Sequence, residues 1–104
     1  MKTGAWFVYV LECADGSLYT GIARDVAARL AAHEAGKGAR YTRGRGPLKL
    51  LRRRRCSGHG EALRLEWAFK RLPREEKVAL LAAPRRFSAF ARKVAVSAQS
   101  SRGR

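Results

Sequence analysis

The sequence predicts an α+β fold in which helices flank a small three-stranded antiparallel or mixed sheet. Three observations lead to this prediction: two strand patterns precede the first helical pattern, a third strand pattern follows it, and two more helical patterns come next. The chain has 104 residues, so we expect one domain, because two halves of that length would each bury too little apolar surface to fold alone.

The first two strands are predicted to form a hairpin. Residues 6–12 (WFVYVLE) are rich in aromatic and β-branched side chains, which favour strands, and residues 18–22 (LYTGI) repeat that character. Asp15 and Gly16, between them, form a dipeptide that is typical of tight turns.

The first helix is expected between Asp25, a favourable N-cap residue, and Gly36, which ends it. Residues 36–46 (GKGARYTRGRG) then form a basic, glycine-rich loop. The third strand begins at Leu48 and runs into four arginines, residues 52–55. Side chains alternate between the faces of a strand, so at most two of these arginines can share the solvent-exposed face. The others need a sheet edge or a carboxylate partner, which predicts an edge strand.

The remaining elements are helices. One is expected over residues 61–72 and another begins at Pro73, with two glutamates in its first turn. After Pro84 the pattern weakens. Three residues would line one face of a last helix, Phe87, Phe90 and Val94, and residues 97–104 resemble a frayed basic tail. We therefore divide the chain into a domain of residues 1–83 and a C-terminal basic extension of residues 84–104, partly helical and then disordered.

The charge balance predicts polyanionic partners. The chain carries 23 Lys and Arg residues against 8 Asp and Glu residues, a formal net charge of +15. Such a surface attracts phosphate backbones, which release condensed counterions on binding. An acidic membrane surface is the weaker alternative, because the basic residues are spread through every segment and do not form one face of an amphipathic helix.

The apolar stretch near the N-terminus is too short for a secretory or membrane-spanning segment, so we expect a cytosolic protein. Cys13 and Cys56 have no spacing typical of zinc ligands, and a disulfide is not expected in the cytosol. Both are predicted to be buried thiols.

Acidic residues are few, and most have a local role in a turn, a cap, a first helical turn or at the end of an element. Glu66 differs, because it lies in the middle of a helix among apolar neighbours. A carboxylate there is costly unless it is paired or bound to a metal. Two interpretations stay open: an i,i+4 ion pair with Lys70, or a functional carboxylate.

Four further residues are candidates for a site. Arg29 and His33 are four apart on the first helix and border its apolar stripe, which directs both toward the sheet. Tyr9 and Tyr19 lie on the two hairpin strands, where core packing is the alternative role for a tyrosine.

The ordered set of these features resembles the GIY-YIG nuclease family, in its short stand-alone bacterial branch. Tyr9 lies in the run VYV and Tyr19 in the run YTG, with Arg29 ten residues later and Glu66 in EALRLE. The resemblance covers roughly residues 6–81. The chain departs from the family pattern at Phe7 and Val8, which replace Gly-Ile, and at Ile22, which replaces a lysine. The chain also contains no asparagine.

The resemblance implies catalytic roles for four residues, Tyr9, Tyr19, Arg29 and Glu66, and His33 is the fifth candidate because histidine titrates near neutral pH. Glu66 would bind a divalent metal ion, Mg²⁺ or Mn²⁺, and Mg²⁺ suits so sparse an oxygen site because it keeps most of its waters. Arg29 would hold the scissile phosphate. Tyr9 would deprotonate the attacking water, which requires a lowered pKa, while His33 is the alternative base at neutral pH.

The glycine-rich loop is predicted to follow a phosphate backbone. It combines four cations with one aromatic side chain that can stack on a base, in the set Lys37, Arg40, Tyr41, Arg43 and Arg45.

These expectations describe a structure-tolerant endonuclease that hydrolyses phosphodiester bonds in DNA, single-stranded or branched, as in repair or recombination. Nucleic acid is the expected partner, with DNA favoured over RNA, and the sequence indicates no membrane and no obligate protein partner. The alternative is a non-catalytic nucleic-acid-binding protein on the same fold. A protein bound to ribosomal RNA ranks last, because it is supported by charge alone.

Overall fold

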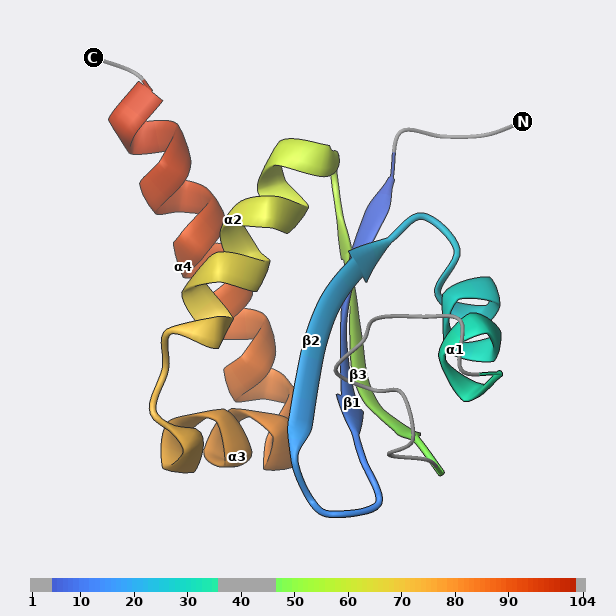
Figure 1. Ribbon diagram of the computed structural model, residues 1–104. Coiled ribbons are helices and arrows are strands. Elements are labelled where there is room, and N and C mark those ends of the chain that lie inside the picture. The colour runs from blue at the N-terminus through green and yellow to red at the C-terminus, as the bar shows by residue number, and fades with distance from the viewer. Residues whose placement is uncertain (1–4, 36–46, 103–104) are drawn as a thin grey trace.

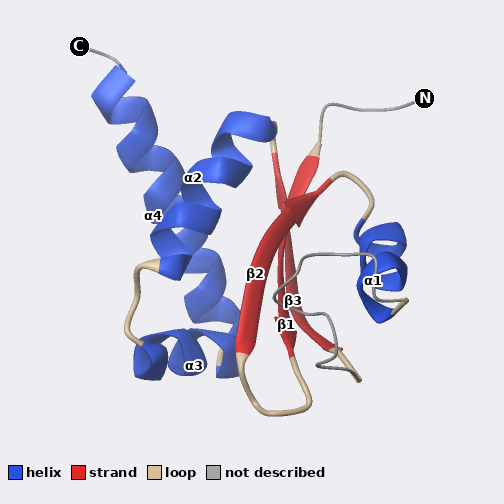
Figure 2. Cartoon of the chain, viewed as in Figure 1, coloured by secondary structure: helices blue, strands red, loops and turns tan. Residues whose placement is uncertain are grey.

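The computed structural model describes residues 5–35 and 47–102, which form a three-stranded antiparallel sheet with helices on both faces (Figure 1). The elements in chain order are β1 (Trp6–Glu12), β2 (Leu18–Ala23), α1 (Val26–Glu34), β3 (Lys49–Cys56), α2 (His59–Lys70), α3 (Arg74–Ala82) and α4 (Pro84–Arg102). Figure 2 shows α1 on one face of the sheet and the other three helices gathered on the opposite face. The predicted α+β fold and its three-stranded sheet are confirmed.

β1 is the central strand of the sheet, whose order is β2-β1-β3 with both pairings antiparallel. Its central position explains the unbroken apolar run, because both faces of the strand are covered. Val8 and Val10 pack toward α2 and α4, whereas Tyr9 and Leu11 pack with residues of α1. The backbone alternation of β1 therefore separates a helical core from the side that carries Tyr9.

The turn between β1 and β2 forms where the Asp-Gly dipeptide predicts it. Gly16 has a φ of +86°, a left-handed conformation that a side chain would disfavour. One Asp15 carboxylate oxygen accepts hydrogen bonds from the backbone N–H and the hydroxyl of Ser17, at 3.0 and 2.6 Å. This local network sets the register that places Gly21 opposite Tyr9.

The arginines of β3 lie at a sheet edge, as their alternation predicts. Arg52 donates to the backbone carbonyl of Leu81, and Arg54 donates to the Ser88 hydroxyl at 3.2 Å. Arg53 points to the opposite face, where its guanidinium lies 5.6 Å from the centroid of the Phe7 ring. Arg52 and Arg54 thus bind a carbonyl of α3 and a hydroxyl of α4, and no carboxylate of the described residues pairs with them.

α4 packs into the core of the helical layer. Phe87 and Ala91 are buried, and the Phe87 ring meets the Phe69 ring of α2 edge-on, with centroids 5.8 Å apart. The frayed tail predicted from residue 97 onward is helical as far as Arg102. Residues 97–102 contain no glycine or proline that would stop the helix, even though the apolar stripe has ended. The segment after residue 83 therefore contributes directly to the core.

Both cysteines are free and buried, as predicted, and burial raises the pKa of the Cys56 thiol to about 11. Within the described ranges, no helix combines the length and the apolar character that crossing a bilayer requires.

Candidate active site

Tyr9 and His33 meet on the face of the sheet that α1 covers. Tyr9 is 1% exposed and His33 is 3% exposed. The Tyr9 hydroxyl oxygen lies 3.0 Å from the Nε2 atom of His33, in a buried hydrogen bond. This contact joins β1 to the last turn of α1 and pairs two groups that can exchange a proton.

Gly21 makes the space for the Tyr9 hydroxyl. It is the cross-strand partner of Tyr9, and a Cβ atom at Gly21 would lie 2.6 Å from the hydroxyl oxygen and 2.8 Å from Cζ. Real Cβ atoms essentially never approach so closely, so any side chain would displace the tyrosine. In the sequence, Gly21 stands out only as part of the run YTG. A glycine inside a strand is a known mark of close approach and could have identified its role.

Tyr19 completes a group of three rings that we call the aromatic triad: Tyr9, Tyr19 and His33. The Tyr19 and His33 ring centroids are 5.2 Å apart and meet edge-on. Tyr9 lies 6.3 Å from Tyr19 and 6.0 Å from His33, measured between centroids. The edge-on and tilted angles are those that aromatic pairs favour, so the three rings hold each other in place.

Arg29 lies one helical turn before His33, with an exposed side chain. Its positive charge acts on the Tyr9 hydroxyl and partly offsets the rise in the pKa of that group. Asp25 caps the start of this helix by accepting from the Ala28 N–H at 3.0 Å, as predicted. The cap and the i,i+4 spacing together direct Arg29 and His33 to the same patch of sheet.

Burial dominates the pKa values of Tyr9 and His33. It raises the pKa of Tyr9 to about 12, with a smaller rise from Tyr19 and a partial offset by Arg29. It also lowers the pKa of His33 below its usual 6.5, and Arg29 lowers it further. Tyr9 is therefore a neutral phenol at pH 7, and His33 is a neutral imidazole. A His33 whose proton is on Nδ1 accepts the hydrogen bond from Tyr9.

Glu66 occupies a different part of the fold. It lies on α2, across the sheet from α1 (Figure 1), and its carboxylate is 3.2 Å from the Lys70 ammonium. The ion-pair interpretation of this residue therefore holds in the structure. The fold brings Tyr9, Tyr19, Arg29 and His33 together, while Glu66 approaches the sheet from the other face.

The side chains that could bind a metal ion near the site fit an ion that needs few protein ligands. Among the described residues, His, Cys, Asp and Glu side chains form no group of three or more that could hold a metal. Glu66 offers one carboxylate, with a side chain 19% exposed, so water can reach it. Mg²⁺ and Mn²⁺ accept oxygen ligands of this kind, and Mg²⁺ usually keeps several of its waters.

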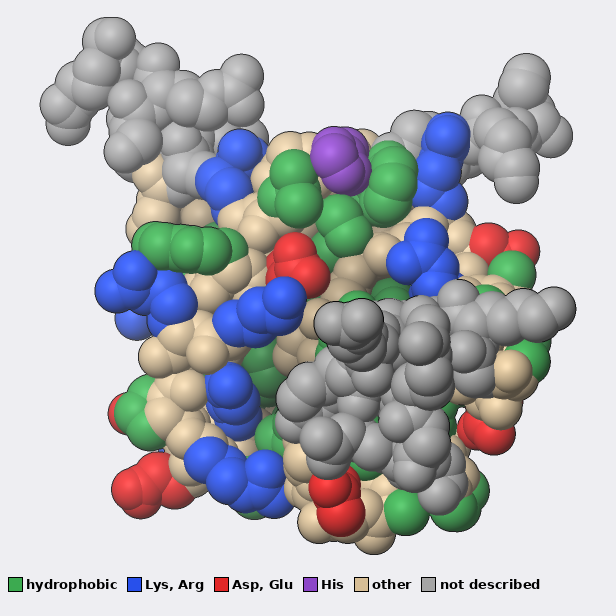
Figure 3. Space-filling view, in the orientation of Figure 1, with side chains coloured by type: hydrophobic (Ala, Val, Ile, Leu, Met, Phe, Trp, Pro, Cys, Tyr) green, Lys and Arg blue, Asp and Glu red, His purple; other side chains and the backbone are tan. Residues whose placement is uncertain are grey.

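The predicted cationic loop of Lys37, Arg40, Tyr41, Arg43 and Arg45 lies outside the described residues. Figure 3 shows Lys and Arg side chains spread over the face in view, with acidic side chains fewer among them. A hollow beside α1 is lined in part by Trp6, Arg24 and Arg29. Positive charge therefore reaches the border of the triad.

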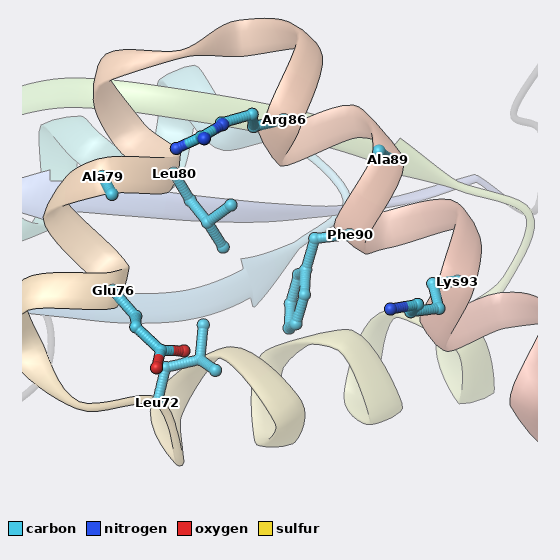
Figure 4. A pocket seen from close by; sticks show the side chains of 8 residues that line it. All are labelled: Leu72, Glu76, Ala79, Leu80, Arg86, Ala89, Phe90 and Lys93. Atoms are coloured by element: carbon cyan, nitrogen blue, oxygen red, sulfur yellow. The ribbon is translucent and has the colours of Figure 1, made fainter.

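A hollow of about 530 Å³ lies among the end of α2, α3 and α4 (Figure 4). Leu72, Leu80 and Phe90 line it, and charged side chains from α3 and α4 stand at its rim. It belongs to the helical layer, across the sheet from the triad, so we do not assign it to the candidate site.

Comparisons with known proteins reveal a consistent group of relatives. The model of the GIY-YIG catalytic domain matches residues 5–78. A UPF0213 protein of Nitratidesulfovibrio vulgaris is 52% identical over 77 residues, covering 74% of this chain and 70% of that protein. A UPF0213 protein of Cupriavidus pinatubonensis is 51% identical over 77 residues, covering 74% and 86%. The solution NMR structure of a UPF0213 protein from Bacillus halodurans is 46% identical, with a TM-score of 0.51, over 75% of this chain and 83% of that one.

Proposed function

The chain belongs to the GIY-YIG catalytic domain family, a family of nucleases, and from this premise we propose that it is a metal-dependent endonuclease acting on DNA. One observation carries the proposal: the buried hydrogen bond between Tyr9 and His33 lies beside the exposed guanidinium of Arg29. A proton-transfer pair next to an anion-binding group is what phosphodiester hydrolysis needs. The net charge of +15 favours a polyanionic substrate.

Tyr9 and His33 act as one base in this mechanism. The Tyr9 hydroxyl takes a proton from the attacking water and passes its own proton to Nε2 of His33. His33 accepts it because its lowered pKa keeps the imidazole neutral at pH 7. This relay avoids a free phenolate, which the raised pKa of Tyr9 opposes. Arg29 holds the scissile phosphate through paired hydrogen bonds, and Tyr19 orients the water or a phosphate oxygen.

Glu66 would hold the metal ion, Mg²⁺ or Mn²⁺, which would supply charge neutralisation at the phosphoryl oxygens and at the leaving oxygen. Before the ion binds, Lys70 neutralises this carboxylate across 3.2 Å. β2 is an edge strand between α1 and α2. A phosphate backbone that lies along this edge would meet Arg29 from one face of the sheet and Glu66 from the other.

The substrate class follows from the same features. The contacts assigned so far are to phosphates, so we expect structure-tolerant cutting of single-stranded or branched DNA, suited to repair or recombination. The loop cations Lys37, Arg40, Arg43 and Arg45, with Tyr41, would follow the backbone beyond the site. DNA is favoured over RNA, no obligate protein partner is invoked, and a cytoplasmic location fits such a substrate.

A cleavage assay tests the proposal. Purified protein is incubated with single-stranded, duplex and branched DNA in Mg²⁺, Mn²⁺ or EDTA, next to Tyr9→Phe and Glu66→Ala. We expect cleavage that requires the divalent ion, that falls by about 10² to 10⁴ in Tyr9→Phe, and that is lost in Glu66→Ala with the fold retained. Activity that persists in EDTA, or a Glu66→Ala protein that cuts at the wild-type rate, would remove the metal assignment.

A second candidate function is nucleic-acid binding without catalysis. The Glu66–Lys70 ion pair favours it, because Lys70 already satisfies the carboxylate that a metal would need. The same assay distinguishes the two functions. A protein that binds all three DNA forms tightly, and cuts none of them in either metal, is a binding protein.

A further inference from the structure

Trp67 is the most exposed large apolar side chain among the described residues, with 62% of its surface accessible. It directly follows Glu66 on α2. Leu63, one turn earlier, is also exposed, at 43%. A helix that only covered the sheet would have polar residues at these exposed positions. Exposed apolar side chains of this kind mark an interaction surface, and we call Leu63 and Trp67 the apolar flank of α2.

The geometry of α2 places this flank next to Glu66. Ala62, Leu65 and Phe69 face the core. At 100° per residue, Glu66 borders that face, Leu63 and Lys70 come next, and Trp67 follows further round the helix. A hollow of about 390 Å³ is lined by Leu63, Arg64, Glu66, Trp67 and Lys70. The indole and the carboxylate therefore line the same hollow.

Cations surround the indole. The Arg71 guanidinium carbon lies 4.4 Å from the centroid of the Trp67 ring, and Arg64 and Lys70 line the hollow beside it. Covering this flank with an apolar protein surface would strip water from three cations, whereas only one carboxylate, Glu66, lines the hollow. A nucleic-acid strand provides both a counter-charge for the cations and an apolar partner for the indole. Its phosphates neutralise the cations, and its bases have π-faces that stack on an aromatic ring.

We propose that Trp67 is a stacking platform for an unpaired base of the bound strand, adjacent to the carboxylate of Glu66. The proposal rests on the nuclease function above and adds a substrate preference to it. A base can reach Trp67 only when it is out of a duplex, so the flank selects single-stranded or splayed segments. The platform then positions the strand along the hollow that Glu66 and Trp67 both line.

Fluorescence can test the stacking directly. Trp6 and Trp67 are the two tryptophans of the chain, so Trp6→Phe leaves Trp67 as the single indole reporter. The full-length Trp6→Phe protein is titrated in EDTA with a short oligothymidylate, and separately with an abasic oligomer of equal length and charge. We expect the oligothymidylate to quench Trp67 and the abasic oligomer to bind without quenching. Equal quenching by both probes, or by neither, would overturn the proposal.

Affinity gives the second measurement. Trp67→Ala should weaken oligothymidylate binding by about 5- to 150-fold, the equivalent of ~1–3 kcal/mol per stacked base, and Trp67→Phe should retain most of the affinity. Binding of the abasic oligomer should be unchanged in both variants. Val78→Ala, which truncates a 46% exposed side chain on α3, is the matched control. An unchanged dissociation constant in Trp67→Ala would refute stacking and leave a protein partner as the occupant of this flank.

These outcomes separate the two proposals. Binding in EDTA does not depend on cleavage, so a chain that fails to cut in Mg²⁺ can still show base-dependent quenching of Trp67. Conversely, a Trp67→Ala protein that binds and cuts like the wild type would remove the platform and leave the nuclease function intact.

Discussion

Among single residues, Gly21 and His33 decide the state of Tyr9. The hydroxyl of Tyr9 occupies the space that a Gly21 side chain would fill, and it bonds a histidine that burial keeps neutral. The position and protonation of the Tyr9 hydroxyl therefore depend on two residues that the fold brings to it. Each leads to a prediction at this scale.

Gly21→Ala should lower the free energy of unfolding by about 1–3 kcal/mol, because extra volume in a filled site displaces its neighbours. Cleavage should fall with it, as the Tyr9 hydroxyl moves away from His33. Urea denaturation and the cleavage assay measure the two effects. Gly60→Ala is the matched control, because a Cβ there meets Arg64 at an ordinary 3.5 Å. Alanine also favours the helix by up to about 1 kcal/mol. If the two variants have the same free energy of unfolding, the close approach at Gly21 does not contribute to stability.

His33 should make stability depend on pH. Its folded-state pKa is below the ordinary 6.5, so the unfolded chain binds this proton more readily than the folded chain. The contribution of His33 is complete above pH 6.5 and is lost as the pH falls from there through the lowered pKa. We expect the free energy of unfolding to fall less in His33→Gln than in the wild type when the pH is lowered from about 7.5 to about 5.5. Urea denaturation at the two pH values measures this difference. Parallel losses in the two proteins would contradict the lowered pKa.

Among the elements, β3 and α4 hold the helical layer on the sheet. Two arginines of β3 donate hydrogen bonds, one to the Leu81 carbonyl of α3 and one to the Ser88 hydroxyl of α4. The Phe87 ring of α4 packs against the Phe69 ring of α2. The edge strand and the last helix therefore depend on each other. A division of the chain at residue 83 passes through this shared core.

Phe87→Ala should lower the free energy of unfolding by about 3–5 kcal/mol, because it leaves a cavity beside Phe69. That is a large part of the ~5–15 kcal/mol that stabilises most domains. Val96→Ala is the control on the same helix, since Val96 is 60% exposed and its truncation should change stability by about 0.5 kcal/mol or less. Equal losses in the two variants, by urea denaturation, would show that α4 is not needed for the core.

For the whole molecule, the net charge is the property that we expect to set the affinity for nucleic acid. The net charge of +15 is distributed over the entire chain, so affinity for nucleic acid should be mainly electrostatic. Under the two proposals, the site beside Arg29 and the Trp67 platform would add local contacts to that general attraction. Salt dependence separates the two contributions.

The logarithm of the binding constant should fall linearly with the logarithm of salt concentration, by about 0.7 for each phosphate neutralised on a single strand. Replacing Arg40, Arg43 and Arg45 with alanine should flatten this slope without changing the cleavage rate at saturation. Titrations at several salt concentrations measure it. An unchanged slope would show that the glycine-rich loop does not follow the backbone.

The sequence by itself determined the elements, because their signals are local. Asp15-Gly16 predicted the turn, Asp25 predicted the helix start, and the alternation of the β3 arginines predicted an edge strand. The α2 boundaries differ from the prediction by two residues at each end, since capping decides the last turns. The motif spacing indicated the family, which the comparisons confirm.

Only the tertiary structure decided the chemistry of the site. Tyr9 and His33 are 24 residues apart, and strand register, the gap at Gly21 and the packing of α1 together bring them to 3.0 Å. The directions of their pKa shifts come from burial, which no local pattern contains. The packing of Phe87 and the exposure of Trp67 are likewise long-range outcomes. A residue's local sequence sets its backbone preferences, whereas its dielectric surroundings and its neighbours are set by segments that are distant in the chain.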